Sequence, residues 1–209
     1  MVDKGTSRAR RARIDGRARK ASGRPLSFTV REQLMQRFLR VFVVALALAS
    51  CATQLETATF HAPDGFGKWK AAGGSDRRGR TLAEFVPQDE SIENWSRLLT
   101  VQFIEQQGVS PMEFMTQLRA TMQNRCAGTS WRIVQQDPTS VLYEWSIAGC
   151  GSNPDQHEIA RLLKGNDGIQ RIAFTRKGVE LEPSEREQWI KTFSEAYVVK
   201  GGQRVVVSP

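Results

Sequence analysis

The sequence contains few of the side chains from which catalytic and metal-binding sites are usually built. Its 209 residues include two histidines, His61 and His157, and three cysteines. A structural zinc site takes about four ligands of these types, so no metal site is predicted. The sequence also lacks the P-loop, the glycine-rich dinucleotide turn, and the HExxH and G-x-S-x-G motifs. We therefore predict no catalytic, metal or cofactor-binding residue, and we expect binding rather than catalysis.

Long hydrophobic runs are missing as well. The apolar run Val41–Ala49 has nine residues, whereas a membrane-spanning helix needs about 20. Arg37 and Arg40 precede this run, and polar residues follow it from Thr53 onward. Residues 35–50 therefore have the proportions of a secretory signal peptide rather than of a membrane span.

The cysteine after this segment belongs to the most specific motif in the chain. Leu48-Ala49-Ser50-Cys51 resembles the lipobox of bacterial lipoproteins. The resemblance implies that the Cys51 thiol takes up a diacylglyceryl group, that cleavage follows Ser50, and that the new amino terminus is acylated, as with palmitate. Two or three acyl chains anchor a protein stably where one does not. By resemblance to Gram-negative sorting, Ala52 implies an outer-membrane location facing the periplasm.

Charge is distributed unevenly along the chain. Residues 1–50 contain 12 Lys/Arg against 3 Asp/Glu, a net of +9, and residues 51–209 contain 18 against 19, a net of −1. Residues 1–34 form a basic extension that we expect to be disordered, and Met35 is a natural start that would leave them untranslated. A cytoplasmic protein that binds nucleic acid with this basic arm is an alternative. The nearly neutral remainder predicts no nucleic-acid partner.

The two remaining cysteines, Cys126 and Cys150, form an even pair in a compartment that is expected to be oxidising. A structural disulfide is the natural prediction, and closing a loop of about 25 residues would stabilise the fold by roughly 3 kcal/mol in the chain-entropy model. One alternative is a small envelope enzyme in which Cys150 acts as a nucleophile with His157 nearby, or in which a carboxylate pair works.

Composition and periodicity divide the mature chain into three parts. Residues 51–80, rich in Gly, Ala and charge, are expected to be a lipidated tether and an irregular lead-in. Residues 81–199 are expected to form one domain, followed by a tail over 200–209 that the pattern does not assign. Period-2 alternation and turn residues predict strands at 81–87, 94–104, 130–136, 140–150, 157–165 and 169–178.

Two helices are predicted within this domain. Ser110 is an N-cap, Pro111 occupies the first helical position and Glu113 closes a capping box. Met115, Leu118 and Met122 continue one apolar stripe and are expected to be core, although methionines also suit an adaptable partner-binding surface. A second helix opens near Pro183. The residues predicted on its buried side are Trp189, Ile190, Phe193 and Tyr197.

Consecutive hairpins with one inserted helix and one final helix predict an α+β fold, an antiparallel sheet with two main helices packed on it as a two-layer sandwich. The order strand–strand–helix–four strands–helix resembles the Mog1/PsbP-like fold, a family of small binding modules, and that resemblance implies binding. We therefore expect a lipid-anchored envelope protein that acts as a binding or assembly-accessory module on an envelope protein or peptide. Of the five tryptophans, Trp69 is expected to be the most exposed, and the other four to be core.

Overall fold

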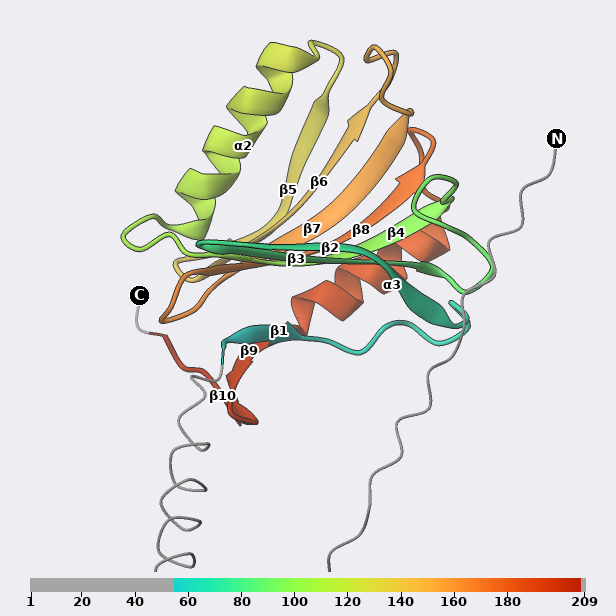
Figure 1. Ribbon diagram of the computed structural model, residues 1–209. Helices are drawn as coiled ribbons and strands as arrows, with labels where there is room; N and C mark the ends of the chain where they lie inside the picture. Colours follow the sequence, from blue (N-terminus) through green and yellow to red (C-terminus); the bar gives the residue numbers. More distant parts are fainter. Residues whose placement is uncertain (1–54, 208–209) are drawn as a thin grey trace, which may run out of the picture. The chain divides into compact units, whose positions relative to one another are not determined.

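The computed structural model describes residues 55–207 (Figure 1). The basic extension, the signal segment and Cys51 lie outside these residues. Residues Thr53–Pro209 form one compact unit, and both hydrophobic clusters of the described chain lie within it. Among residues 55–207, no helix is both long and apolar enough to cross a membrane.

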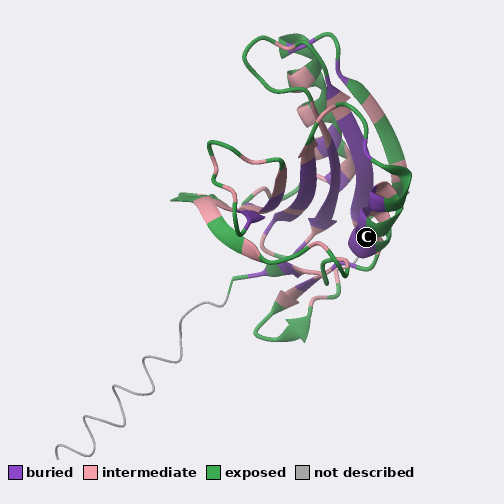
Figure 2. Cartoon of the chain, turned by 90° about the vertical axis from the view of Figure 1, so that its right-hand side faces the viewer, coloured by how far each residue is buried: buried purple, intermediate pink, exposed green. Residues whose placement is uncertain are grey.

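A seven-stranded sheet dominates the fold, and every neighbouring pair of its strands is antiparallel. In spatial order its strands are β2 (Trp69–Arg77), β3 (Arg80–Pro87), β4 (Arg97–Ile104), β8 (Ile169–Lys177), β7 (Gln156–Lys164), β6 (Ser140–Ile147) and β5 (Ser130–Asp137). A separate small sheet contains β1 (Thr57–Thr59), β9 (Tyr197–Lys200) and β10 (Gln203–Arg204). The central strands are the most buried, and the outer strands β2 and β5 are largely exposed (Figure 2).

Helices α2 (Pro111–Arg125) and α3 (Pro183–Ser194) both contact β6 and β7, but from opposite faces of the sheet (Figure 1). The alternation of β6 shows this directly, because Leu142 belongs to the cluster with α3 while Val141 and Tyr143 belong to the cluster with α2. The predicted α+β class, with an antiparallel sheet and two helices, is confirmed. The arrangement differs from a two-layer sandwich, since the sheet lies between the helices.

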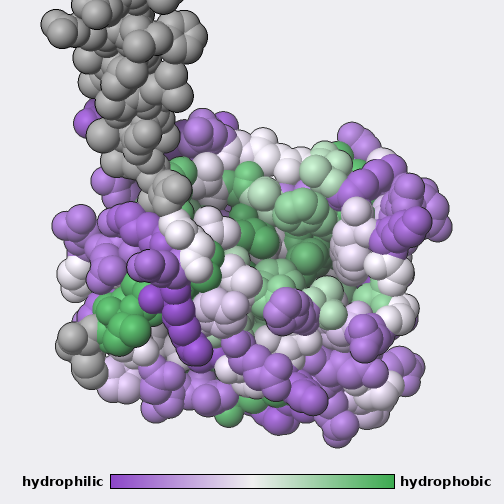
Figure 3. All heavy atoms as spheres, turned by 90° about the horizontal axis from the view of Figure 1, so that it is seen from below, coloured by the Kyte–Doolittle hydropathy of each residue, from purple (hydrophilic) through white to green (hydrophobic). Residues whose placement is uncertain are grey.

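The core on the α3 side is filled with aromatic rings. Trp189 stacks on Phe174 with centroids 4.3 Å apart, and Phe66 and Phe193 lie 5.3 and 5.2 Å from the Trp189 ring. Further apolar side chains pack partly buried against this core, and Figure 3 shows apolar side chains gathered in a hollow on the face seen from below. Trp69 is one of these half-buried residues, so it is less exposed than the sequence suggested.

Local sequence explains most of the elements. Ser110 Oγ accepts from the Glu113 backbone N–H and the Glu113 carboxylate accepts from the Ser110 N–H, which completes the predicted capping box of α2. In the β5–β6 turn, Asp137 accepts from the backbone and hydroxyl of Thr139 and from the Ser140 hydroxyl. These hydrogen bonds to the Asp137 carboxylate stabilise the reversal of the chain.

The expected tether over 51–80 is wrong for its described part, from residue 55 onward. β1 pairs with β9, and β2 forms a hairpin with β3 that extends the main sheet. Gly73 and Gly74 lie within β2, and every residue of this edge strand except Trp69 is polar, glycine or alanine, so no period-2 pattern marks it. Residues 51–54 lie outside the described part.

Two further differences concern strand and helix ends. Tyr197 lies in β9 and not on the second helix, which ends at Ser194, and the tail forms β10. Trp95 precedes β4, which begins at Arg97.

Glu56, near the start of the described chain, is 2% exposed, and its carboxylate accepts from the backbone N–H groups of Asn166 and Asp167. The start of the described chain is therefore fixed to the β7–β8 turn.

Candidate functional site

A groove lies between α2 and the sheet because the helix packs loosely. Only Pro111 and Met115 of α2 are buried, while Phe114, Leu118 and Met122 are half-buried and line a hollow of about 320 Å³. The predicted core stripe is therefore core at Met115 and groove wall at the other two positions. A hollow of this size is at the lower end of the range for small-ligand sites.

Aromatic rings form part of the opposite wall. Trp131 on the edge strand β5 stacks on Tyr143 and Trp145 of β6, with centroids 5.6 and 5.7 Å apart and nearly parallel planes. Trp131 and Trp145 are cross-strand partners, and both line the groove. This pair presents a flat apolar surface toward the side chains of α2.

Beneath the aromatic wall lies a buried ion pair. Arg171 of β8 donates to Glu158 of β7 at 2.6 Å, and their side chains are 14% and 6% exposed. The register places the small pair Ala160 and Ala173 between the row of Arg171 and the row of Glu158, which leaves room for the guanidinium to reach along the sheet. Burial alone would lower the pKa of Arg171, but the Glu158 charge outweighs it and the pKa lies above its ordinary value.

Both carboxylate oxygens of Glu158 accept hydrogen bonds within this network. Its Oε1 accepts from Trp145 Nε1 at 2.7 Å as well as from Arg171, and its Oε2 accepts from Thr175 Oγ1 at 3.1 Å. A carboxylate that accepts from three donors, one of them a cation, is a poor general base. The network positions the groove wall and does not supply a reactive group.

Two buried donors in this wall have no partner in the described residues, namely Arg171 Nε and Trp131 Nε1. Burial, with the nearby Glu158 charge adding to it and Arg171 opposing it, raises the pKa of Tyr143 to about 12, so the hydroxyl keeps its proton. Arg80, exposed at the start of β3, also lines the groove. The groove thus combines apolar walls with donors and a positive rim, which suits a ligand that carries hydrogen-bond acceptors.

The structure brings the predicted cysteine pair together. Both cysteines are free thiols. A hydrogen bond with Cys126, and to a lesser extent burial, raises the pKa of Cys150. Cys126 is the C-cap of α2, and the Cys150 thiol also lies 3.9 Å from the Arg125 carbonyl oxygen. The disulfide itself stays a prediction, and so does lipidation of Cys51, which lies outside the described residues.

The alternative nucleophile pair is not assembled. His157 Nδ1 lies 3.0 Å from the Val179 carbonyl oxygen and its Nε2 faces Glu144, whereas Cys150 packs with the α2 cluster on the other face. No group of three or more His, Cys, Asp or Glu side chains within residues 55–207 is arranged to hold a metal ion.

Sequence reasoning missed Arg80, Tyr143, Glu158 and Arg171. One signal was present in the sequence. Glu158 shares a strand face with Ala160 and Leu162 and is itself buried, and a charged residue at an inward position of an apolar strand needs a partner. The sequence alone does not say which strand supplies that partner.

Comparisons with known proteins add little to this geometry. No family model matches the chain, and no curated protein matches it. Among solved structures, the chain is similar to a mutant of the protein Mog1, with 15% identity and a TM-score of 0.37, over 65% of this chain and 78% of that one. A likeness this distant carries no argument, so the resemblance to the Mog1/PsbP-like fold stays a prediction and function is argued from the groove itself.

Proposed function

We propose that this protein is a lipid-anchored binding module of the cell envelope, whose ligand site is the groove between α2 and the sheet. The lipobox-like sequence ending at Cys51 supports the anchor, and Ala52 supports an outer-membrane location facing the periplasm. The observation that carries the ligand site is the coincidence of a half-buried apolar stripe on α2 with unpartnered donors on the facing wall.

The ligand is an apolar or aromatic body that bears an acceptor-rich acidic group. Phe114, Leu118 and Met122 would contact the body, together with the stacked face of Trp131. The acidic group would accept a hydrogen bond from the unpartnered Nε–H of Arg171 or form an ion pair with Arg80. Glu158 neutralises Arg171 but not Arg80, so Arg80 keeps an uncompensated positive charge. Charge-assisted bonds of this kind are roughly twice as strong as neutral ones.

Binding of 8-anilinonaphthalene-1-sulfonate to the compact unit Thr53–Pro209 tests the site, since this probe has an aromatic body and one sulfonate. We expect saturable binding that quenches tryptophan fluorescence. Leu118→Trp fills the groove and should weaken binding by at least about tenfold. Ala120→Trp, on the exposed opposite side of α2, is the matched control and should bind as the parent does. Equal binding by both variants would overturn the assignment.

The anchor and the disulfide have separate tests. The intact mass of the protein from a membrane fraction should correspond to a chain that begins at Cys51 and carries acyl mass, and a species that begins upstream without acyl mass contradicts the anchor. Under denaturing, non-reducing conditions, titration of the exported protein should find no reactive thiol at Cys126 or Cys150. Two reactive thiols would refute the predicted pairing.

A further inference from the structure

Three arginines crowd the β2–β3 turn, which we call the arginine turn: Arg77, Arg78 and Arg80. Arg77 and Arg80 are direct cross-strand partners, and like charges in that position destabilise a hairpin. All three side chains are exposed. Within residues 55–207, none of them forms an ion pair or a side-chain hydrogen bond. The hairpin therefore holds an unrelieved positive charge that a bound anion would stabilise.

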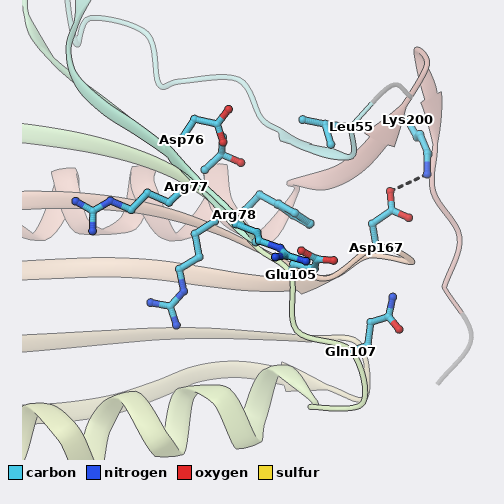
Figure 4. Close-up of a pocket in the computed structure, with 12 residues that line it drawn as sticks. Leu55, Asp76, Arg77, Arg78, Glu105, Gln107, Asp167 and Lys200 are labelled. Atoms are coloured by element: carbon cyan, nitrogen blue, oxygen red, sulfur yellow. Dashed lines mark hydrogen bonds and ion pairs between the residues drawn. The ribbon is translucent and has the colours of Figure 1, made fainter. Parts of the chain in front are cut away.

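Acidic groups near the turn do not neutralise it. The turn lines a hollow of about 440 Å³ that also contains Asp76, Glu105, Asp167 and Lys200, and Lys200 is paired with Asp167 at 2.7 Å. Figure 4 shows Arg77 and Arg78 extended away from Glu105 and Asp167. The three arginine charges at this hollow therefore outnumber the two carboxylates left unpaired, Asp76 and Glu105.

The position of the turn in the chain indicates what the anion is. Leu55 lines the same hollow and is 62% exposed, and it follows Cys51 by four residues. Four extended residues span at most about 14 Å. A lipid on Cys51 therefore holds the membrane surface within about that distance of Leu55, on the side of the domain that carries the arginine turn. A surface of anionic headgroups has the charge that this turn lacks.

We propose that the arginine turn binds the headgroups of anionic phospholipids and seats the domain on the membrane that holds its anchor. The proposal rests on the proposed lipid anchor for its geometry. Because Arg80 lines both the hollow at the turn and the groove under α2, this seating brings one rim of the groove to the membrane surface.

Vesicle partition of the compact unit Thr53–Pro209, which lacks the anchor and the basic leader, tests the proposal without them. We expect sedimentation with phosphatidylcholine vesicles that contain phosphatidylglycerol, little with phosphatidylcholine alone, and loss of binding as salt is raised. Each arginine near an anionic surface contributes about fivefold, so Arg77→Gln with Arg78→Gln should lower the partition coefficient about 25-fold. The matched control, Arg119→Gln with Arg125→Gln on the exposed side of α2, should lower it much less.

The outcomes separate this proposal from the one on which it rests. Equal partition into both kinds of vesicle, or equal loss in the two double variants, overturns the arginine turn as a headgroup site, whatever the intact mass shows. Selective partition with a mass that lacks acyl chains supports the headgroup site and contradicts the anchor. Thermal unfolding of the Arg77→Gln, Arg78→Gln variant should show no loss of stability, since the change relieves repulsion between the strands, and Arg78→Gln alone provides a second, milder test.

Discussion

Removing the carboxylate of Glu158 is the sharpest test of the buried network beneath the groove. In Glu158→Leu, the Arg171 guanidinium keeps its charge but loses the partner 2.6 Å away, and Trp145 Nε1 and Thr175 Oγ1 lose their acceptor. The Arg171 side chain is 14% exposed, so water replaces little of what is lost.

The loss of the Glu158 carboxylate should cost several kcal/mol in the free energy of unfolding. Breaking a buried pair by removing one partner costs about 3–5 kcal/mol, and a donor left without an acceptor costs about 1–3 kcal/mol. A domain of this kind has a total stability of about 5–15 kcal/mol, so Glu158→Leu should lower the free energy of unfolding by at least about 3 kcal/mol. Adding Arg171→Met removes the stranded charge. The double variant should therefore be more stable than Glu158→Leu alone.

Urea unfolding followed by tryptophan fluorescence measures these differences, with the slope checked for two-state behaviour. Glu180→Leu is the control, because Glu180 is exposed and forms no hydrogen bond or ion pair within the described residues, and it should change stability by less than about 0.5 kcal/mol. A cost below about 1 kcal/mol for Glu158→Leu, or a double variant as unstable as the sum of the single ones, would refute the reasoning.

Two further predictions concern the rest of the sheet. Burial alone would raise the pKa of Glu144, but hydrogen bonds with His157 and Arg186 hold this pKa at about 2. The ionised Glu144 carboxylate therefore stabilises the fold above about pH 4.5, and this stabilisation is lost as the pH falls toward 2. Urea unfolding across this range should show a shallower pH dependence in Glu144→Gln. A Cβ at Gly165 would overlap the Glu56 carboxylate, so Gly165→Ala should cost about 1–3 kcal/mol by thermal unfolding; a cost that persists unchanged in a Glu56→Ala background would contradict this cause.

The elements that could be predicted are those whose signals are local. The N-cap at Ser110 and the turn at Asp137 each act within a few residues, so the sequence around them suffices. β2 and β9 escaped prediction because each is defined by its partner strand. β2 is a glycine-containing edge strand that pairs on one side only, with β3, and its own residues carry no alternation.

The candidate site could not be predicted because its residues come from six elements. Arg80, Phe114, Trp131, Trp145 and Arg171 share no spacing that a motif search would detect. The register of β7 against β8 sets Arg171 and Glu158 two rows apart, with alanines between them. Such a register is fixed by pairing over the whole sheet. The cysteine pair could be identified by counting alone, and its disulfide stays a prediction, since Cys126 and Cys150 are free thiols in the structure.

Unpartnered donors beside an open hollow are the strongest reason to place function on the α2 side of the sheet. Buried donors without partners occur on both faces, for example Trp189 Nε1 on α3 and Trp131 Nε1 on β5, opposite α2. Trp189 is enclosed by a ring stacked 4.3 Å away and by two further phenylalanines, so no ligand has room to reach it. Trp131 faces a hollow that α2 leaves open. A helix with a well-formed N-terminus and only two buried residues stabilises the fold less than its apolar stripe would allow, and the unused part of that stripe forms the wall on which a ligand can bind.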